Sequence, residues 1–361
     1  MNMTLHYVAL PLRHPFGISR GTVAVQPSMI VQLTDQGHDG LGEVTENAFY
    51  GHDFASLTAS LRRAAPLLSR YRDRAPAEVW DELRIALHDD WFALSALDMA
   101  AHDLRGKRLN QPTWMDWGLR WQQLVPSSFT IGLDTLEVMQ GKLRQRPGWP
   151  IYKIKLGAEN DLEIVRALRD LTDATFRVDA NCAWTAQQTI DYSHELATLG
   201  VEFIEQPLPI EASTEDKRLV FSGSALPIIA DEDCQQVPDV QRCQGLYHGV
   251  NVKICKCGGL TPALRMLRAA KQVGLRTMVG CMVESSIGIS GAAQLLPLLD
   301  YADLDGAALL REDPACGVRV QRGQVQSSSL PGCGGQLRPE VLDQLRAADH
   351  NGVVLCSERI Q

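Results

Sequence analysis

Five ionisable residues recur along the middle of the chain at nearly equal spacing. Lys155, Asp179, Glu205, Asp231 and Lys256 follow one another at intervals of 24 to 26 residues, each near the end of a short apolar run. One strand, one helix and their connections occupy about this length in a β/α barrel. The spacing therefore predicts that successive units deliver one charged side chain each to the same end of a barrel, where the active site of this architecture lies.

The three consecutive acids have the chemistry of ligands for a hard cation. Carboxylates that converge without a cation repel one another, and their pKa values rise. An all-oxygen set suits Mg²⁺, which keeps open positions for water or substrate. No His or Cys falls on the pattern, which disfavours zinc. We therefore expect one Mg²⁺ per subunit, bound by Asp179, Glu205 and Asp231.

The two flanking lysines predict acid–base chemistry. They fall on the second and sixth predicted strands, so Lys155 and Lys256 should face each other across an eight-stranded ring. Lys153 shares a strand face with Lys155, and we expect its like charge and burial to lower the pKa of that base. Two bases on opposite faces of a metal-held carboxylate substrate predict proton abstraction from its α-carbon through a stabilised enediolate. The result is racemisation or epimerisation.

Short β runs alternate with helical stretches in the second part of the chain, which predicts parallel strands. Eight such runs favour a (β/α)8 TIM-type barrel, and the alternative doubly wound sheet lacks a GxGxxG after its first strand. The predicted strands cover residues 128–132, 151–157, 175–181, 201–208, 227–233, 249–256, 276–282 and 300–306.

The first part of the chain has a different pattern, typical of an α+β domain. We predict strands within 3–12 and 28–45, loops at 13–22 and 46–53, and helices within 54–71 and 90–109, the last ending at Gly106 and Lys107. The tail after residue 324 is rich in Gly and Ser, then helical. The predicted organisation is a capping domain (1–122), a barrel (123–324) and a C-terminal segment (325–361) that returns to the cap.

Bulk properties exclude several classes of partner. The net charge of −8 argues against nucleic-acid binding, which needs a basic face. The sequence has no apolar run of membrane-spanning length and no signal-peptide pattern. Its nine cysteines are scattered without a CxxC pair, which is typical of free thiols in a reducing cytoplasm. We therefore expect a cytoplasmic protein, a homo-oligomer, with a small-molecule substrate.

The motifs YKIKLG, FRVDANCAW, FIEQPLP, IIADED and NVKICKCGGL resemble the enolase superfamily and, within it, the muconate-lactonizing-enzyme subgroup. The resemblance covers almost the whole chain and implies a modified barrel under an α+β cap. It implies that Lys155 and Lys256 form the acid/base pair, serving the D and the L configuration respectively, that the three acids bind Mg²⁺, and that Asn181 and Lys253 support them. The usual ADES appears as ADED, a departure at Asp233.

The segment DYADLDG is similar to the motif by which dipeptide epimerases of the subgroup hold the α-ammonium group of the substrate. Asp303 and Asp305 would share a strand face and clamp that group. The resemblance implies inversion of the C-terminal residue, with L-Ala-D/L-Glu as a candidate substrate. The predicted pocket residues are Thr130, Cys281 and Met282, together with Arg20, which either binds an acidic side chain or has a structural role in its loop.

Other functions remain open at this point. N-acylamino-acid racemases and o-succinylbenzoate synthases of the same subgroup act on substrates without a free ammonium group, which would leave Asp303 and Asp305 without a partner. Muconate cycloisomerisation would use the same metal site but would use the two lysines differently. A barrel that only binds peptide or metal is a non-enzymatic alternative, and lysines on both faces argue against it because binding needs neither.

Overall fold

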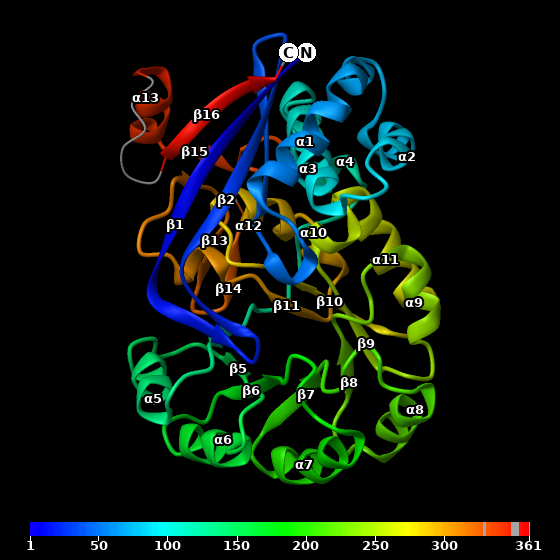
Figure 1. The fold of residues 1–361 in the computed structure, drawn as a ribbon, viewed down its shortest axis with the longest axis vertical. Coiled ribbons are helices and arrows are strands. Elements are labelled where there is room, and N and C mark those ends of the chain that lie inside the picture. The colour runs from blue at the N-terminus through cyan, green and yellow to red at the C-terminus, as the bar shows by residue number, and fades with distance from the viewer. Residues whose placement is uncertain (328–329, 348–353, 361) are drawn as a thin grey trace.

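The computed structural model describes residues 1–327, 330–347 and 354–360. Figure 1 shows a sheet and a group of helices at the top of the view and a ring of strands and helices below. The top sheet is antiparallel in the order β16-β1-β2-β3. Its strands are β1 (Asn2–Ile18), β2 (Gly21–Asp35), β3 (His38–Thr45) and β16 (Val354–Ile360).

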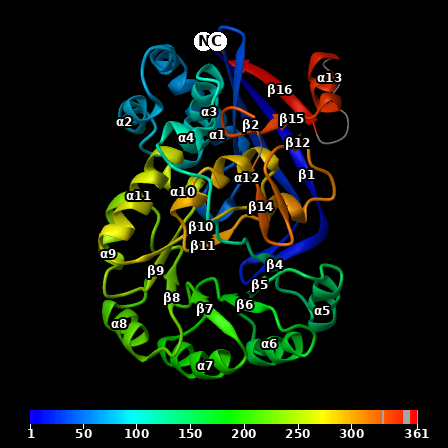
Figure 2. The same cartoon turned by 180° about the vertical axis from the view of Figure 1, so that it is seen from behind.

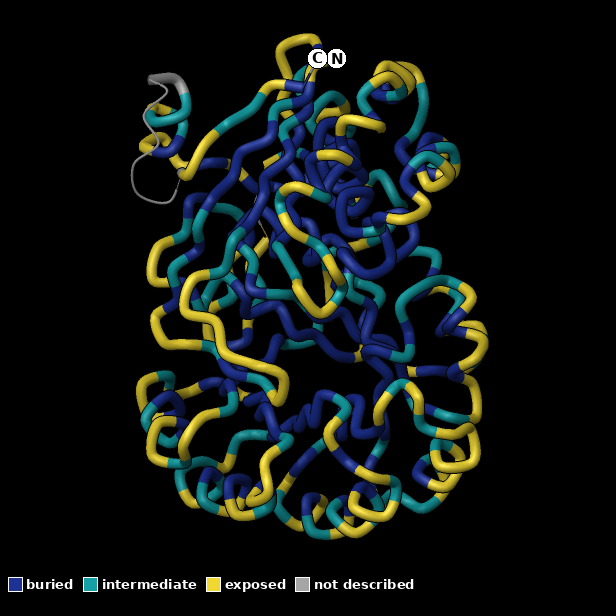
Figure 3. Tube along the Cα trace, in the orientation of Figure 1, coloured by how far each residue is buried: buried dark blue, intermediate teal, exposed yellow. Residues whose placement is uncertain are grey.

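The hairpin formed by β1 and β2 is longer than the sequence predicts. Residues 13–22 were expected to form a loop, but pairing continues to the tip, with Phe16 opposite Val23 and Ile18 opposite Gly21. The register shifts between Pro11 and Phe16, where proline cannot donate a ladder hydrogen bond. Most residues of this segment are exposed (Figure 3), which is typical of a loop, and the pairing depends on a partner strand that the local pattern does not reveal.

The helices of the capping part pack beside this sheet and continue towards the barrel. They are η1 (Ala48–Tyr50), α1 (Phe54–Ala64), η2 (Ala65–Arg72), α2 (Pro76–Ala86), α3 (Trp91–Arg108) and α4 (Thr113–Asp116). The sequence predicts an end of α3 at Gly106, which is wrong because the helix continues to Arg108. Gly106 serves close packing instead, since a Cβ there would lie 2.5 Å from the Cα of Gly332.

Eight parallel strands form the lower ring, in the unbroken order β4 to β11. A bridge between Ser127 and Ala302 brings the first and last strands together, and the predicted barrel is confirmed. The strands are β4 (Phe129–Ile131), β5 (Ile151–Lys155), β6 (Thr175–Asp179), β7 (Val201–Glu205), β8 (Ile228–Ala230), β9 (Gly249–Val252), β10 (Arg276–Gly280) and β11 (Tyr301–Asp303).

Helices cover the outside of the ring (Figure 2). They include α5 (Leu136–Arg144), α6 (Asp161–Arg169), α7 (Ala186–Thr198), α8 (Thr214–Gly223), α9 (Val237–Cys243) and α11 (Leu260–Gln272). The shorter elements after the last three strands are α10 (Ile254–Cys257), α12 (Ser286–Ala293), η3 (Leu296–Leu298) and η4 (Gly306–Leu309). The predicted strand at 249–256 is partly wrong. β9 ends at Val252, and the next residues form the single turn α10, which ends at the left-handed Gly258.

Apolar side chains fill the interior of the barrel below the end that carries the charged residues. Phe203, Ile229, Met278 and Tyr301 form a buried cluster. Phe203 precedes Glu205 by two positions, so both side chains point to the same face of their strand. The strands therefore carry an apolar floor and present their charged residues above it.

The C-terminal segment returns to the first sheet. After the barrel strands the chain forms β12 (Ala315–Cys316), β13 (Arg319–Gln321) and β14 (Gln324–Gln326), and then β15 (Gln336–Leu337), α13 (Pro339–Ala347) and β16. β16 pairs antiparallel with β1, Ile360 opposite Met3. The domain boundaries after residues 122 and 324 remain predictions. Among the described residues, no helix has the length and apolar character to cross a membrane.

Candidate active site

Three buried carboxylates meet at the upper end of the barrel. Asp179 ends β6, Glu205 ends β7, and Asp231 directly follows β8. One oxygen from each lies within 4.8 Å of the others, and all three residues are buried. Three anionic oxygens at this separation, each from a neighbouring strand end, fit a hard divalent cation such as Mg²⁺.

Lysine ammonium groups reach this carboxylate cluster from two sides. Lys155 Nζ lies 2.6 Å from Asp179 Oδ2, and Lys256 Nζ lies 2.5 Å from Asp231 Oδ1. β5 and β9 are four strands apart in the ring, so the two lysines approach from opposite sides. Burial tends to raise the pKa of Asp179, but the ammonium groups of Lys155 and Lys153 outweigh it and hold that pKa below its usual range.

Lys153 forms ion pairs that the sequence did not predict. Its ammonium group lies 2.7 Å from Glu205, 2.9 Å from Asp303 and 3.2 Å from Asp179. Burial alone would lower the pKa of Lys153, but these carboxylates raise it well above the usual value. The sequence shows only the like charge of the neighbouring lysine and the apolar surroundings, and these three partners come from other strands. They explain how an apolar strand accommodates a buried ammonium group.

Asn181 and Lys253 contact the carboxylate cluster from its edges. Lys253 Nζ lies 2.9 Å from Asp231 Oδ2. Asn181 adopts a positive φ of 44°, and its backbone N–H donates to Asp179 Oδ1 over 2.9 Å. Both residues therefore orient carboxylates of the cluster.

Two further polar residues were missed by the sequence analysis. Asn251 Nδ2 donates to Glu205 Oε1 over 2.8 Å, and Gln206 Oε1 accepts from the backbone N–H of Asp231 over 2.9 Å. Gln206 directly follows Glu205, so its place after a strand end was a signal that could have been used. Gln206 Nε2 also donates to Asp233, the residue that departs from the usual motif, over 3.3 Å.

Asp303 and Asp305 lie at the wall of the barrel beside the first strand. Asp303 accepts from Ser128 Oγ over 2.7 Å, and Asp305 accepts from the backbone N–H of Thr130 over 2.6 Å. Burial and the neighbouring charge of Asp303 raise the pKa of Asp305 to about 7. Both carboxylates line the same cavity, so an ammonium group in that cavity would find two acidic partners.

This cavity has a volume of about 940 Å³ and lies between the cap and the barrel end. The hairpin and the loop at 46–53 supply one wall, and barrel residues supply the other. The predicted residues Thr130, Cys281 and Met282 all line it, as do Lys153, Lys155, Asn181, Lys253, Asp303 and Asp305. Phe49 and Tyr50, which the sequence analysis did not single out, cover it from the loop.

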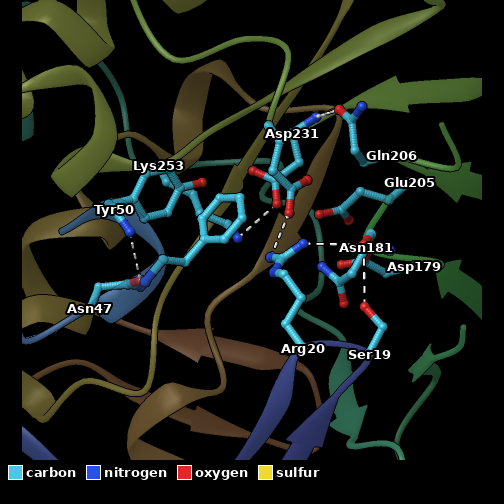
Figure 4. Close-up of polar contacts among 12 residues, drawn as sticks. Ser19, Arg20, Asn47, Tyr50, Asp179, Asn181, Glu205, Gln206, Asp231 and Lys253 are labelled. Carbon is cyan, nitrogen blue, oxygen red and sulfur yellow. Dashed lines mark hydrogen bonds and ion pairs between the residues drawn. The ribbon is translucent and has the colours of Figure 1, made fainter. Parts of the chain in front are cut away.

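Arg20 stands at the hairpin tip and is already paired (Figure 4). Its Nη2 lies 2.8 Å from Glu232 Oε1, and its Nη1 donates to the carbonyl of Asn181 over 3.1 Å. The guanidinium carbon also lies 4.2 Å from the centre of the Phe49 ring. Arg20 lines the cavity as predicted, with its charge matched by Glu232.

Known proteins match this chain over most of its length. Residues 1–116 match the family described as mandelate racemase/muconate lactonizing enzyme, N-terminal domain, and residues 138–341 match the enolase C-terminal domain-like family. An L-Ala-D/L-amino acid epimerase of Flavobacterium johnsoniae is 45% identical over 334 residues, which cover 92% of this chain and 99% of that protein. An L-Ala-D/L-Glu epimerase of Bacteroides thetaiotaomicron is 37% identical, covering 92% and 87%.

A solved structure has the same fold. The dipeptide epimerase of Enterococcus faecalis, complexed with Mg and the dipeptide L-Leu-L-Tyr, superposes with a TM-score of 0.84 at 27% identity. The match covers 93% of this chain and 99% of that one.

Proposed function

The chain belongs to the mandelate racemase/muconate lactonizing enzyme family of the enolase superfamily, and from that premise we propose that it is a metal-dependent dipeptide epimerase. It is an isomerase that inverts the α-carbon of the C-terminal residue of a dipeptide. The epimerases among its relatives and the dipeptide-bound neighbour support this assignment.

The observation that carries the proposal is the buried carboxylate cluster with a lysine on each side. Asp179, Glu205 and Asp231 would hold one Mg²⁺ per subunit, and the ion would supply positive charge beside the substrate carboxylate. Lys155 takes the α-proton from one face of the substrate, and the ammonium group of Lys256 returns a proton to the other face. The opposite epimer uses the same two groups in reverse.

The paired acids on the wall favour a dipeptide over an N-acylated amino acid. Asp303 and Asp305 are both buried, and Lys153 compensates only part of their negative charge. The α-ammonium group of a dipeptide would supply the remaining positive charge, and an N-acyl group would not. This favours dipeptides over the substrates of N-acylamino-acid racemases and o-succinylbenzoate synthases.

The C-terminal side chain would face the hairpin and the loop at 46–53. Arg20 is the cation available for an acidic side chain there, as in L-Ala-D/L-Glu, and its ion pair with Glu232 has to open first. The surrounding wall includes Val23, Val25 and Phe49, each exposed by more than a third. We therefore include both acidic and apolar C-terminal residues in the test below.

A dipeptide library in deuterated water with Mg²⁺, read by mass spectrometry, tests the proposal. We expect deuterium at the α-carbon of the C-terminal residue, followed by epimerisation, and no exchange in a variant that carries both Lys155→Ala and Lys256→Ala. Exchange in N-acylamino acids alone would favour the racemase alternative. No exchange in either class would leave a barrel that only binds. A cytoplasmic location and a homo-oligomeric state are also proposed, and fractionation and sedimentation would test them.

A further inference from the structure

The two lysines are held by different parts of the fold. Lys155 is the last residue of β5 and pairs in register with Asp179 of β6, so the barrel sheet holds its backbone. Lys256 lies beyond the end of its strand. It belongs to α10, a helix of four residues, whereas β9 already ends at Val252. A single helical turn has too few internal hydrogen bonds to be stable alone. Contacts from outside the barrel sheet must therefore stabilise α10.

Two side chains of the cap contact the backbone directly after this turn. Trp80 of α2 donates its indole N–H to the carbonyl of Gly258 over 2.7 Å. Asp98 of α3 accepts from the backbone N–H of Thr261 over 2.7 Å and from its hydroxyl over 2.9 Å. Trp80 and Asp98 are both buried, so water does not compete for these hydrogen bonds.

The fit between the cap and the turn leaves no room for side chains. A Cβ on Gly258 would lie 2.8 Å from a ring carbon of Trp91, and one on Gly259 would lie 2.4 Å from Asp98 Oδ2. Both glycines have positive φ, 93° and 129°, which other residues rarely adopt. The backbone that follows Lys256 is thus pressed against α3 and bonded to α2.

We propose that Trp80 and Asp98 are positioning residues for Lys256, so that these helices of the cap align one of the two bases while a strand of the barrel sheet carries the other. The inference rests on the proposed two-base function and extends it. A disturbance at Trp80 or Asp98 would weaken proton transfer on the Lys256 face of the substrate and leave the Lys155 face intact. The two half-reactions of one enzyme therefore depend on different domains.

Trp80→Phe is the sharpest variant, because it keeps an aromatic ring in the core and removes only the N–H donor. The epimer that exchanges through Lys256 is first identified as the one that Lys256→Ala no longer deuterates. We expect Trp80→Phe to slow exchange of that epimer by about threefold to tenfold, the range for one lost hydrogen bond. Exchange of the other epimer should stay within about twofold of the parent, on the same reasoning.

Trp114→Phe is the matched control. Trp114 belongs to α4 of the cap, and its indole N–H is buried without a hydrogen-bond partner in the structure. It should leave both exchange rates unchanged. Asp98→Asn is a second test variant, which keeps the shape of the side chain and weakens its bonds to Thr261. Thermal melts check that each variant is folded.

Amide hydrogen exchange of the metal-free protein is an independent measurement. The N–H groups of Lys256, Cys257 and Gly258 donate within the turn, and Trp80→Phe should speed their exchange whereas Trp114→Phe should not. Equal slowing of both epimers, or unchanged amide exchange in folded Trp80→Phe, would overturn the inference. A parent protein that deuterates neither epimer would overturn the proposed function instead, and amide exchange would still decide whether Trp80 holds the turn.

Discussion

At the scale of single residues, the site is a balance of buried charges. Asp179, Glu205 and Asp231 are buried together, and burial with the charge of Asp179 raises the pKa of Glu205 to about 7 despite Lys153. Lys153, Lys155, Lys253 and Lys256 each have at least one carboxylate oxygen within 3 Å. Removing one partner would leave an uncompensated buried charge, which is more costly than the intact pair. Substitutions here therefore need a readout of chemistry as well as of stability.

Separate removal of the two lysines should divide the reaction into halves. Lys256→Ala should abolish interconversion but still exchange the α-proton of the epimer that presents it to Lys155, since removal and return on one face need one base. Lys155→Ala should show the same behaviour with the other epimer. Loss of a general acid or base costs about 10²–10⁴-fold, so NMR in deuterated water can measure the residual exchange. If both variants exchange the same epimer, the lysines do not act on opposite faces.

Dipeptide affinity should depend on pH through Asp305. Its pKa of about 7 means that the carboxyl is largely neutral below that pH and must ionise to bind an ammonium group. The Kd should therefore rise as pH falls below 7, by up to about tenfold per pH unit. It should rise again above about pH 8, where the amino group of the substrate loses its charge.

Calorimetry on the Lys256→Ala variant, which cannot interconvert the epimers, measures this Kd. Asp305→Asn should bind more weakly at pH 7.5 and lose the dependence below pH 7. If the Kd of Asp305→Asn still rises below pH 7, the pH dependence belongs to another group.

At the scale of elements, the barrel strands carry the chemical groups and the cap forms the opposite wall. The hairpin tip touches the barrel, where Gly17 accepts from the backbone N–H of Leu133 over 2.8 Å. A Cβ at Gly17 would lie 2.2 Å from the Leu133 carbonyl oxygen, so glycine allows the hairpin to lie this close. The lysines and the metal-site carboxylates belong to the barrel, and the hairpin lines the cavity opposite barrel residues such as Lys155 and Lys253.

Shortening the hairpin between Phe16 and Thr22 should change which dipeptides react more than whether any reacts. The segment lines the cavity but contains none of the three carboxylates or the two lysines. The relative kcat/KM values over a dipeptide panel measure the effect, and a thermal melt checks that the sheet remains folded. An unchanged substrate profile in a folded variant would show that the tip does not select the side chain.

At the scale of the whole molecule, buried carboxylates join the cap to the barrel. Glu43 of β3 accepts from the hydroxyl of Ser285 over 2.6 Å and from the backbone N–H of Gly288 over 2.8 Å, at the start of α12. Asp103 of α3 accepts from the backbone N–H of Cys333 over 2.7 Å and so joins the cap to the C-terminal segment. These bonds are buried, so cap and barrel should unfold together.

Chelation should abolish activity without unfolding the protein. The ammonium groups of the surrounding lysines compensate the carboxylates, and the two large apolar cores, which include none of these charged residues, do not depend on the metal. Far-UV circular dichroism should be unchanged, and added Mg²⁺ should restore turnover and raise the melting temperature, because it binds only the folded state. Activity that persists after complete chelation would contradict the magnesium assignment.

The sequence by itself determined the barrel and the order of its charged residues. Successive side chains of a strand point to opposite faces of the sheet. Short apolar runs that recur once in each β/α unit therefore predict the strands of the barrel. All eight predicted runs contain a strand. Because parallel strands end at one rim, Asp179, Glu205 and Asp231 could be expected to meet, and one oxygen of each lies within 4.8 Å of the others.

Only the tertiary structure decided the pairings between distant segments. Arg20 meets Glu232, Lys153 meets Asp303, and the turn of Lys256 meets Trp80, none of which a local pattern encodes. The extended hairpin and the place of Lys256 on a helix were misread for the same reason. Local propensity is worth less than about 1 kcal/mol per residue, and burial or hydrogen bonding against a partner far along the chain outweighs it.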